Sequence, residues 1–264
     1  MITLDKCTKY FHRGSVNEVL ALNEMSLHVD EGEFVSVIGS NGAGKSSLLN
    51  CIAGTFFIDS GSIQIDGKEM SKVPEYKRAA FISRVFQDPM KGTCPSASIE
   101  QNLALALRRG LPRRLCKGVK GEYREKFREV LSQLGLGLEE RSSDRVGLLS
   151  GGQRQAITML MATLRRPDVL LLDEHIAALD PKTAAQILQL TEKIVTEQKL
   201  TTLMITHNMK HAIHFGNRLI MLHQGKVLFD ISGEDKKNLT VEKLLTKFYQ
   251  NQGEELASDS LLLS

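Results

Sequence analysis

Residues 34–46 decide the fold, and they read Phe34-Val35-Ser36-Val37-Ile38-Gly39-Ser40-Asn41-Gly42-Ala43-Gly44-Lys45-Ser46. The apolar run 34–38 is typical of a buried β-strand, and it ends directly in a glycine. Residues 46–53 have helical character. The sequence therefore predicts a strand, a glycine-rich loop and a helix in direct succession.

The loop follows the pattern GxxxxGK[ST]. Glycines can turn successive N–H groups toward phosphate oxygens, and a helix start adds its positive dipole end. Lys45 is expected to bridge the β- and γ-phosphates of a nucleotide, and the Ser46 hydroxyl to coordinate Mg²⁺. A glycine turn without a ligand is the alternative, but the strand and helix flanks favour a phosphate loop. The candidate nucleotide-binding residues here are Gly39, Ser40, Asn41, Gly42, Ala43, Gly44, Lys45, Ser46 and Ser47.

A second apolar run, residues 169–172, ends in the adjacent carboxylates Asp173 and Glu174. Ligands of parallel sheets bind at the carboxyl ends of the strands. We therefore assign Asp173 to holding Mg²⁺ through water and Glu174 to accepting a proton from the attacking water. An acidic helix cap after a core strand is the alternative interpretation.

The segment Leu149-Ser150-Gly151-Gly152-Gln153 stands directly before a predicted helix. Serine is a favoured N-cap residue, so a simple cap followed by flexible glycines is one interpretation. In the other, the Ser150 hydroxyl and the amides of Gly151 and Gly152 form a second anion-binding helix start, suited to a γ-phosphate. The spacing alone leaves open whose γ-phosphate this is.

The remaining chain alternates between strand and helix patterns, which predicts a parallel sheet with helices on its faces. The first thirty residues predict short strands around the polar turn 12–15, and residues from 253 onward predict a frayed tail. Further strands are expected at 62–65, 81–86, 169–173, 201–205, 218–222 and 226–231, and helices at 96–107, 122–135, 152–165, 182–198 and 241–249.

The composition is that of an ordinary globular chain, with 264 residues of which 42% are hydrophobic and 25% charged. At this length we expect one folding unit. No run approaches the ~18 apolar residues of a membrane-spanning helix, and no secretory signal opens the sequence, so a cytoplasmic location is the default. The cysteines lie far apart, which favours reduced thiols over a zinc site or disulfides. They are Cys7, Cys51, Cys94 and Cys116.

Positive charge is concentrated between Arg108 and Arg128. This segment contains nine basic and two acidic residues, a local charge of +7 in a chain of net charge +3. A solvated loop and helix face is one interpretation. The other is contact with anionic headgroups or with an acidic partner. A nucleic acid is not expected as a partner.

In combination, these motifs resemble the nucleotide-binding subunit of ATP-binding cassette transporters over nearly the whole chain, from about Ile2 to Tyr249. Three further elements carry the resemblance: Gln87 within residues 86–89, His207 within 205–207, and Ala177-Ala178-Leu179-Asp180 after the acidic pair. The resemblance is specific because it rests on all these motifs in order.

The resemblance implies an α/β fold. It has a mostly parallel sheet core of the phosphate-loop NTPase type, an N-terminal antiparallel β subdomain and an inserted α-helical subdomain. We expect a single domain over 1–264, in which 1–86 and 166–249 form the core with the β subdomain. Residues 87–165 would form the helical subdomain, and 250–264 a flexible tail.

It also implies two copies packed head to tail, so that each ATP lies between the phosphate loop of one copy and the signature of the other. The signature residues are Leu149, Ser150, Gly151, Gly152 and Gln153. Asp180 would contact the other protomer or cap the following helix. Undegraded motifs imply two active sites in a homodimer.

The remaining roles follow from the same resemblance. Glu174 resembles the catalytic base and His207 the switch histidine at the γ-phosphate, with Lys45 and Gln87 also in the catalytic set. Gln87 would sense metal and nucleotide and couple to the permease. The metal set is Ser46, Gln87 and Asp173. Phe11 or Tyr10 would stack on adenine.

The function implied is ATP hydrolysis, with ATP and Mg²⁺ as cofactors, in a bacterial importer similar to those associated with amino-acid uptake. An integral-membrane permease and an extracytoplasmic substrate-binding protein would be separate chains. The subunit would be cytoplasmic and peripheral on the inner face of the cell membrane. The alternatives are a soluble cassette ATPase as in iron–sulfur assembly, a non-hydrolysing nucleotide-gated scaffold, and a small-molecule kinase.

Overall fold

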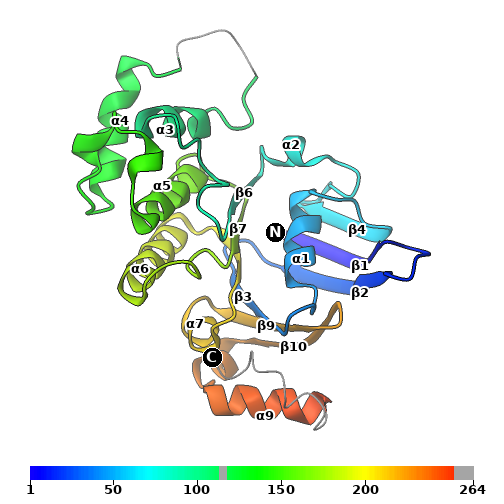
Figure 1. Cartoon of the computed structure of the whole chain (residues 1–264). Coiled ribbons are helices and arrows are strands. Elements are labelled where there is room, and N and C mark those ends of the chain that lie inside the picture. The colour runs from blue at the N-terminus through cyan, green and yellow to red at the C-terminus, as the bar shows by residue number, and fades with distance from the viewer. Residues whose placement is uncertain (113–117, 253–264) are drawn as a thin grey trace. The chain divides into compact units, whose positions relative to one another are not determined.

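The computed structural model describes residues 1–112 and 118–252. Within them the chain forms two compact units, drawn in Figure 1. Unit 1 contains Met1–Arg78 and the described chain from Lys199 onward, and unit 2 contains Ala79–Gln198. The subdivision predicted from the sequence, with its breaks after residues 86 and 165, has other boundaries and stays a prediction.

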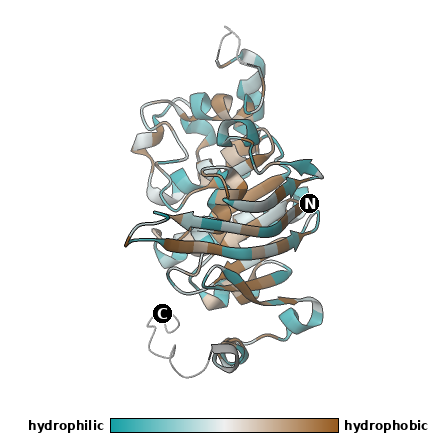
Figure 2. Cartoon of the chain, turned by 90° about the vertical axis from the view of Figure 1, so that its right-hand side faces the viewer, coloured by the Kyte–Doolittle hydropathy of each residue, from teal (hydrophilic) through white to brown (hydrophobic). Residues whose placement is uncertain are grey.

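Unit 1 begins with an antiparallel sheet in the order β2-β1-β4-β5. Its strands are β1 (Ile2–Phe11), β2 (Val19–Val29), β4 (Ser60–Ile65) and β5 (Lys68–Glu69). Leu4 of β1 lies between Leu27 and Ile63 on the neighbouring strands. The alternating bands of hydrophobic and hydrophilic residues along the long strands in Figure 2 fit a sheet with one buried face. The predicted polar turn is confirmed, but the prediction of short strands was wrong, since β1 and β2 have 10 and 11 residues.

Unit 1 also contains parallel strands. β3 (Phe34–Ile38) runs parallel to both β8 (Thr201–Ile205) and β9 (Arg218–His223), and β10 (Lys226–Ser232) returns antiparallel to β9. All five residues of β3 are buried, as are all five of β8. The buried Ser36 hydroxyl donates to the Phe215 carbonyl (2.8 Å), which satisfies this polar group. The strand boundaries predicted for β3 and β8 are confirmed.

The helices of unit 1 are α1 (Lys45–Ala53), α2 (Glu75–Arg78), α7 (Met209–His214), α8 (Gly233–Lys237) and α9 (Val241–Gln252). Buried residues of α7, α9, β9 and β10 share a core with Ile38 of β3. The prediction lacked α2, α7 and α8, because four to six residues are too few for a helical repeat to stand out. Helix α9 runs to Gln252, so residues 250–252 are helical; the expected tail beyond them lies outside the described residues.

The described part of unit 2 combines two parallel strands, β6 (Ile82–Val85) and β7 (Val169–Asp173), with four α-helices. The helices are α3 (Ile99–Leu107), α4 (Gly121–Ser132), α5 (Gly151–Thr163) and α6 (Pro181–Gln198), with short 3₁₀ turns at Glu139–Arg141 and Val146–Leu148. An apolar core is shared by α3, α4, α5 and the 3₁₀ turn before the signature. The four helices predicted for this region are confirmed with shifted ends.

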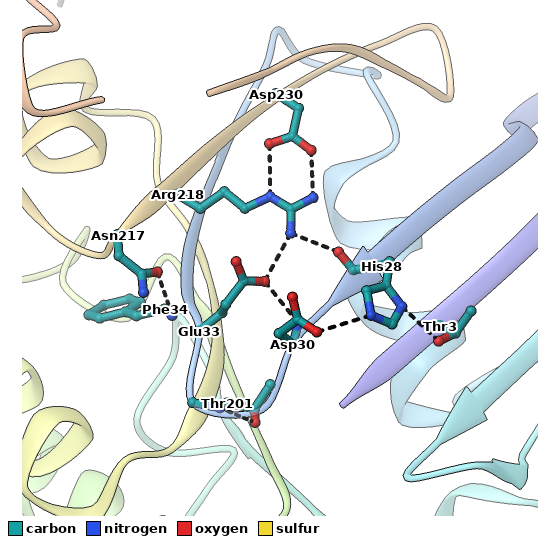
Figure 3. A network of polar contacts seen from close by, with 10 residues as sticks. Thr3, His28, Asp30, Glu33, Phe34, Thr201, Asn217, Arg218 and Asp230 are labelled. Carbon is teal, nitrogen blue, oxygen red and sulfur yellow. Dashed lines mark hydrogen bonds and ion pairs between the residues drawn. The ribbon is translucent and has the colours of Figure 1, made fainter. Parts of the chain in front are cut away.

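A polar network in unit 1 joins the starts of several strands (Figure 3). The Arg218 guanidinium on β9 makes two hydrogen bonds to Asp230 of β10 (2.8 and 2.5 Å) and one to Glu33 (2.9 Å), just before β3. It also donates to the carbonyl of His28 on β2. These carboxylates raise the pKa of Arg218 above its usual value. One side chain thus links the antiparallel sheet to the parallel strands.

The helix that follows the glycine loop is held at its far end by a buried arginine. Arg78 is 1% exposed, and its NH1 donates to the carbonyls of Cys51 and Ile52 (2.7 and 2.8 Å) in the last turn of α1. Its Nε donates to Val73 (2.7 Å). A cation at the carboxyl end of a helix also complements the helix dipole.

We expect Arg78→Met to lower the free energy of unfolding by about 3 kcal/mol, because a buried carbonyl without a donor costs about 1–3 kcal/mol. Urea unfolding of the whole protein measures this. Arg78→Lys should recover part of the loss, and Lys77→Met, at the exposed neighbour, should be close to wild type. Equal stability of Arg78→Met and Lys77→Met would contradict the role given to Arg78.

Candidate functional site

The glycine loop connects β3 to α1 within unit 1. Gly39, Gly42 and Gly44 have positive φ angles of 151°, 78° and 99°. A Cβ at Gly39 would lie 2.4 Å from the Leu222 carbonyl oxygen, and one at Gly44 would lie 2.7 Å from that of Ala21. Both positions therefore require glycine for space as well as for conformation.

Lys45 is the first residue of α1, and its ammonium group is held within the loop. Its Nζ donates to the carbonyls of Gly39 (2.6 Å) and Ser40 (2.9 Å), and the residue is only 5% exposed. Ser46 is exposed in the first turn of α1, beside Ser47. A lysine charge, a hydroxyl and a helix N-terminus thus meet at one turn, which is an arrangement that attracts phosphate.

The two candidate adenine-stacking rings lie at the end of β1. Phe11 packs edge-on against Phe56 (centroids 5.2 Å apart), and the Arg13 guanidinium lies 5.0 Å from the Tyr10 ring centroid. In the β1–β2 pairing, Tyr10 and Phe11 face Leu20 and Val19, next to the Ala21 carbonyl that approaches Gly44. Both rings are half-buried, and the choice between them stays open.

His207 lies at the same sheet edge as the glycine loop. β8 and β3 are parallel with Ile205 opposite Val37, so the residues after both strands emerge together. The Thr206 amide donates to the Val37 carbonyl (3.2 Å), which fixes this turn beside the end of β3. Asn208 then caps α7 by accepting from the His211 amide (3.2 Å). The structure therefore brings His207 and the glycine loop to one edge of unit 1.

In unit 2 the acidic pair ends β7. Asp173 is its last residue, and Glu174 follows with a φ of 47°, an uncommon conformation for a residue other than glycine. β6 lies parallel to β7 with Val85 opposite Leu172, so Gln87, two residues beyond β6, emerges at the same edge. Gln87 is exposed. Unit 2 thus presents the predicted carboxylates and the predicted amide together.

Arg84 of β6 is a residue of this edge that sequence reasoning missed. Its NH2 group lies 2.5 Å from Oδ2 of Asp173. The only signal in the sequence is an arginine between Ser83 and Val85 in a predicted strand, and the identity of its partner depends on the register of β6 with β7. No local pattern reveals that register.

The signature segment forms the start of α5 in unit 2. The Ser150 hydroxyl accepts from the Gln153 amide (3.2 Å), and the Gln153 side chain accepts from the Ser150 amide (3.2 Å), a complete capping box. Leu149 is buried in the core of unit 2. A Cβ at Gly152 would lie 2.1 Å from Cγ2 of Thr183, so this glycine allows close packing against α6.

Asp180 caps α6. Its carboxylate accepts from the Thr183 amide (3.1 Å), and hydrogen bonds from the side chain and backbone of Thr183 hold the pKa of Asp180 below its usual value. A Cβ at Gly151 would lie 3.5 Å from the Leu179 side chain. The segment containing Asp180 and the signature are therefore neighbours within unit 2.

The basic segment is only partly within the described residues, since Arg113, Arg114 and Lys117 lie outside them. Arg109 is structural, because its NH1 donates to the Ala162 carbonyl at the end of α5 (3.0 Å). Arg124 pairs with Glu100, and Arg128 pairs with Glu140. The two ion pairs support the interpretation of Arg124 and Arg128 as part of a solvated helix face. The proposed contact with a membrane or an acidic partner stays a prediction.

A groove of about 1150 Å³ in unit 1 lies between α7 and α8. Lys236 lies in its wall, is 4% exposed and donates to the carbonyls of Ile213, Phe215 and Gly216 (3.2, 2.8 and 2.7 Å). Ile213 lies in the last turn of α7, and Phe215 and Gly216 directly follow the helix. The ammonium therefore closes the carboxyl end of that helix.

Burial lowers the pKa of Lys236 to about 8, from an ordinary value of 10.5. Between these values the unfolded chain binds a proton that the folded protein does not, so the free energy of unfolding rises with pH through this window. Relative to Lys236→Met, wild type should gain up to about 3 kcal/mol between pH 8 and 10.5, at about 1.4 kcal/mol per pKa unit. Urea unfolding at several pH values measures this. Lys237→Met is the control, and parallel pH curves for wild type and Lys236→Met would contradict the prediction.

Among the described residues, no helix has the combination of length and apolarity that crossing a bilayer requires.

Comparison with known proteins agrees with this set of motifs. The profile of a family described as ABC transporter matches residues 22–177. A tyrosine transport ATP-binding protein of Clostridioides difficile (strain R20291) is 46% identical over 248 residues, covering 94% of this chain and 98% of that protein. The spermidine/putrescine import ATP-binding protein PotA of Haemophilus influenzae (strain ATCC 51907 / DSM 11121 / KW20 / Rd) is 34% identical over 228 residues, covering 85% of this chain and 58% of that protein.

Solved structures show the same fold. A dimeric post-hydrolysis state of the ATP-binding cassette MJ0796, bound to ADP and Pi, is 30% identical with a TM-score of 0.75. The match covers 88% of this chain and 98% of that one. The predicted α/β fold of a nucleotide-binding cassette is therefore confirmed.

Proposed function

This chain belongs to the ABC transporter family as one of its ATP-hydrolysing cassettes, and we propose that it drives import of an amino acid through a separate membrane permease. The observation that carries the substrate class is the 46% identity to a tyrosine transport ATP-binding protein over nearly the full length of both chains. Relatives named for spermidine/putrescine and for aliphatic sulfonates are less similar, at 34% identity.

Reconstitution with the proposed permease and substrate-binding protein tests the substrate class. We expect tyrosine or a related amino acid to stimulate ATP hydrolysis and uptake into vesicles, whereas spermidine and an aliphatic sulfonate should not. Stimulation by a polyamine or a sulfonate alone would contradict amino-acid import. Wild-type turnover with no membrane association after cell fractionation would instead support a soluble cassette ATPase, and undetectable turnover in the complex would support a scaffold.

Within each unit, the geometry supports the proposed residue roles. In unit 1, the glycine loop with Lys45 and Ser46 would bind the phosphates, His207 would contact the γ-phosphate, and Phe11 or Tyr10 would stack on adenine. In unit 2, Glu174 would act as the base. Asp173 and Gln87 would hold Mg²⁺ with Ser46; all three offer the oxygen ligands that Mg²⁺ prefers, and such sites are usually completed by phosphate oxygens and water. Bound there, Mg²⁺ would neutralise charge on the phosphates.

We also propose a homodimer in which the signature acts on the nucleotide of the other copy. In support, a similar cassette is dimeric with ADP and Pi bound. The capping bond uses an oxygen lone pair of Ser150 and leaves the donor function of its hydroxyl available for a phosphate oxygen. Ser150 and Gly151 are also exposed on unit 2. A cytoplasmic position on the permease, with a substrate-binding protein outside and no nucleic acid partner, completes the proposal.

Ser150→Ala separates capping from the proposed action in trans. We expect it to lower ATP turnover by at least tenfold and to leave ATP binding by the isolated subunit unchanged, because a lost hydrogen bond to a charged group is worth about 1.5–3 kcal/mol. Steady-state hydrolysis and equilibrium nucleotide binding measure the two quantities.

Ser98→Ala is the matched control. Ser98 starts α3 with the same capping box, accepting from the Gln101 amide at 3.2 Å. Both variants should lose a similar amount of stability, about 0.5–2 kcal/mol, but only Ser150→Ala should lose turnover. Loss of ATP binding by the isolated Ser150→Ala subunit, or equal turnover in the two variants, would contradict a role in trans.

A further inference from the structure

The ion pair between Arg84 and Asp173 places a guanidinium on the carboxylate that is proposed to hold the metal. NH2 of Arg84 and Oδ2 of Asp173 are 2.5 Å apart, and the side chains are only 13% and 17% exposed. The guanidinium carbon also lies 4.8 Å from the centroid of the Phe86 ring. The ion pair with Asp173 places the guanidinium at the end of β7, and the Phe86 ring packs against it.

The position of Arg84 in strand β6 fixes its contact with Asp173. Its neighbours Ser83 and Val85 are buried, and the Ser83 hydroxyl donates to the Ala162 carbonyl of α5 (2.6 Å). Removing an arginine from most of its water is costly unless the charge is paired. Asp173 supplies that pair, and the parallel register of β6 with β7 brings the two side chains together.

A guanidinium and a divalent cation compete for the same carboxylate oxygens. Arginine donates to carboxylate oxygens, and Mg²⁺, directly or through a bound water, also needs those oxygens. An arginine this close to Oδ2 reduces the negative charge available to a metal. It also fixes the rotamer of the aspartate.

We propose that Arg84 is a positioning residue that holds Asp173 and competes with the divalent cation for its carboxylate. Metal binding is then coupled to loosening of the Arg84–Asp173 pair, and the pair sets a higher metal requirement than Asp173 alone would give. This inference rests on the metal-binding role proposed above for Asp173.

Titration with Mn²⁺, followed by electron paramagnetic resonance of the free ion, tests the proposal without relying on turnover. The full-length Glu174→Gln protein with saturating ATP serves as the background, so that ATP persists during the titration. Arg84→Met should bind Mn²⁺ about tenfold more tightly than this background, and Arg84→Lys, which keeps the charge, should stay close to it. Unchanged or weaker Mn²⁺ binding by Arg84→Met overturns the competition.

Three further variants separate the possible failures. Arg141→Met removes an arginine from another pair of unit 2 (Arg141–Asp144, 2.8 Å) and should leave Mn²⁺ affinity unchanged; a gain equal to that of Arg84→Met would overturn the proposal as a general charge effect. Asp173→Asn should weaken Mn²⁺ binding; if it does not, the metal role of Asp173 fails. If Asp173→Asn weakens Mn²⁺ binding while Arg84→Met leaves it unchanged, the metal role of Asp173 stands and only the competition by Arg84 fails. Should Arg84→Met not fold, Arg84→Gln gives the same test with a polar side chain.

Discussion

Glu174→Gln is expected to lower ATP turnover by about 10² to 10⁴, the usual worth of a positioned general base, while ATP still binds. Glutamine keeps the size of the side chain but cannot take a proton from water. Because Glu174 directly follows β7 in a left-handed turn, its carboxylate is set by the strand end rather than by a flexible loop. Steady-state hydrolysis with saturating Mg²⁺ and ATP measures the loss.

The same variant should accumulate as an ATP-bound dimer, since the step that separates the two copies is blocked. Size-exclusion chromatography with and without ATP measures this. Glu129→Gln, at an exposed residue of α4, removes the same charge and should hydrolyse ATP at the wild-type rate. Wild-type turnover in Glu174→Gln would show that another group accepts the proton.

The phosphate loop could be predicted from the sequence because its requirements are local. The pattern GxxxxGK[ST] occupies the consecutive residues 39–46, and Gly39, Gly42 and Gly44 adopt the positive φ angles that glycine favours. The strands β3, β7 and β8 were predicted at their observed boundaries, because each is a short apolar run between polar turns. Both features depend on residues next to one another in the chain.

Features that depend on register or on very short elements could not be predicted. The Arg84–Asp173 pair joins residues 89 positions apart and requires the parallel alignment of β6 with β7. Helix α7 has six residues and is stabilised by the Asn208 cap and by a buried lysine from α8, neither of which leaves a periodic pattern. The lengths of β1 and β2 likewise follow from their pairing with each other.

The signature shows how one residue can satisfy two interpretations. From the sequence, Ser150 was either a helix cap or an anion ligand, and the structure confirms the cap. The cap does not use the hydroxyl proton, and it orients the serine at the start of α5. Capping therefore prepares the geometry that an anion site would need, and the comparison with Ser98 isolates the difference between them.

Lys45→Met is expected to weaken ATP binding by the isolated subunit by about 10²-fold or more. A lysine that bridges two phosphates makes charge-assisted hydrogen bonds, each worth about 1.5–3 kcal/mol. Methionine keeps the apolar stem but removes the charge, and it also removes the bonds to the Gly39 and Ser40 carbonyls that hold the loop. Equilibrium binding of a fluorescent ATP analogue measures the change.

Two effects of Lys45→Met can be separated experimentally. Disturbance of the loop changes stability without nucleotide, whereas loss of the charge changes the stabilisation by ATP. If the loop alone is disturbed, Lys45→Met loses stability without nucleotide, and Lys45→Arg, which retains a donor and a charge, restores part of both stability and affinity. If the charge contacts phosphate, ATP should raise the melting temperature of wild type and of Lys72→Met, a control at an exposed lysine of unit 1, but not that of Lys45→Met. Tight ATP binding by Lys45→Met would show that Lys45 does not contact phosphate and that the loop is only a structural turn.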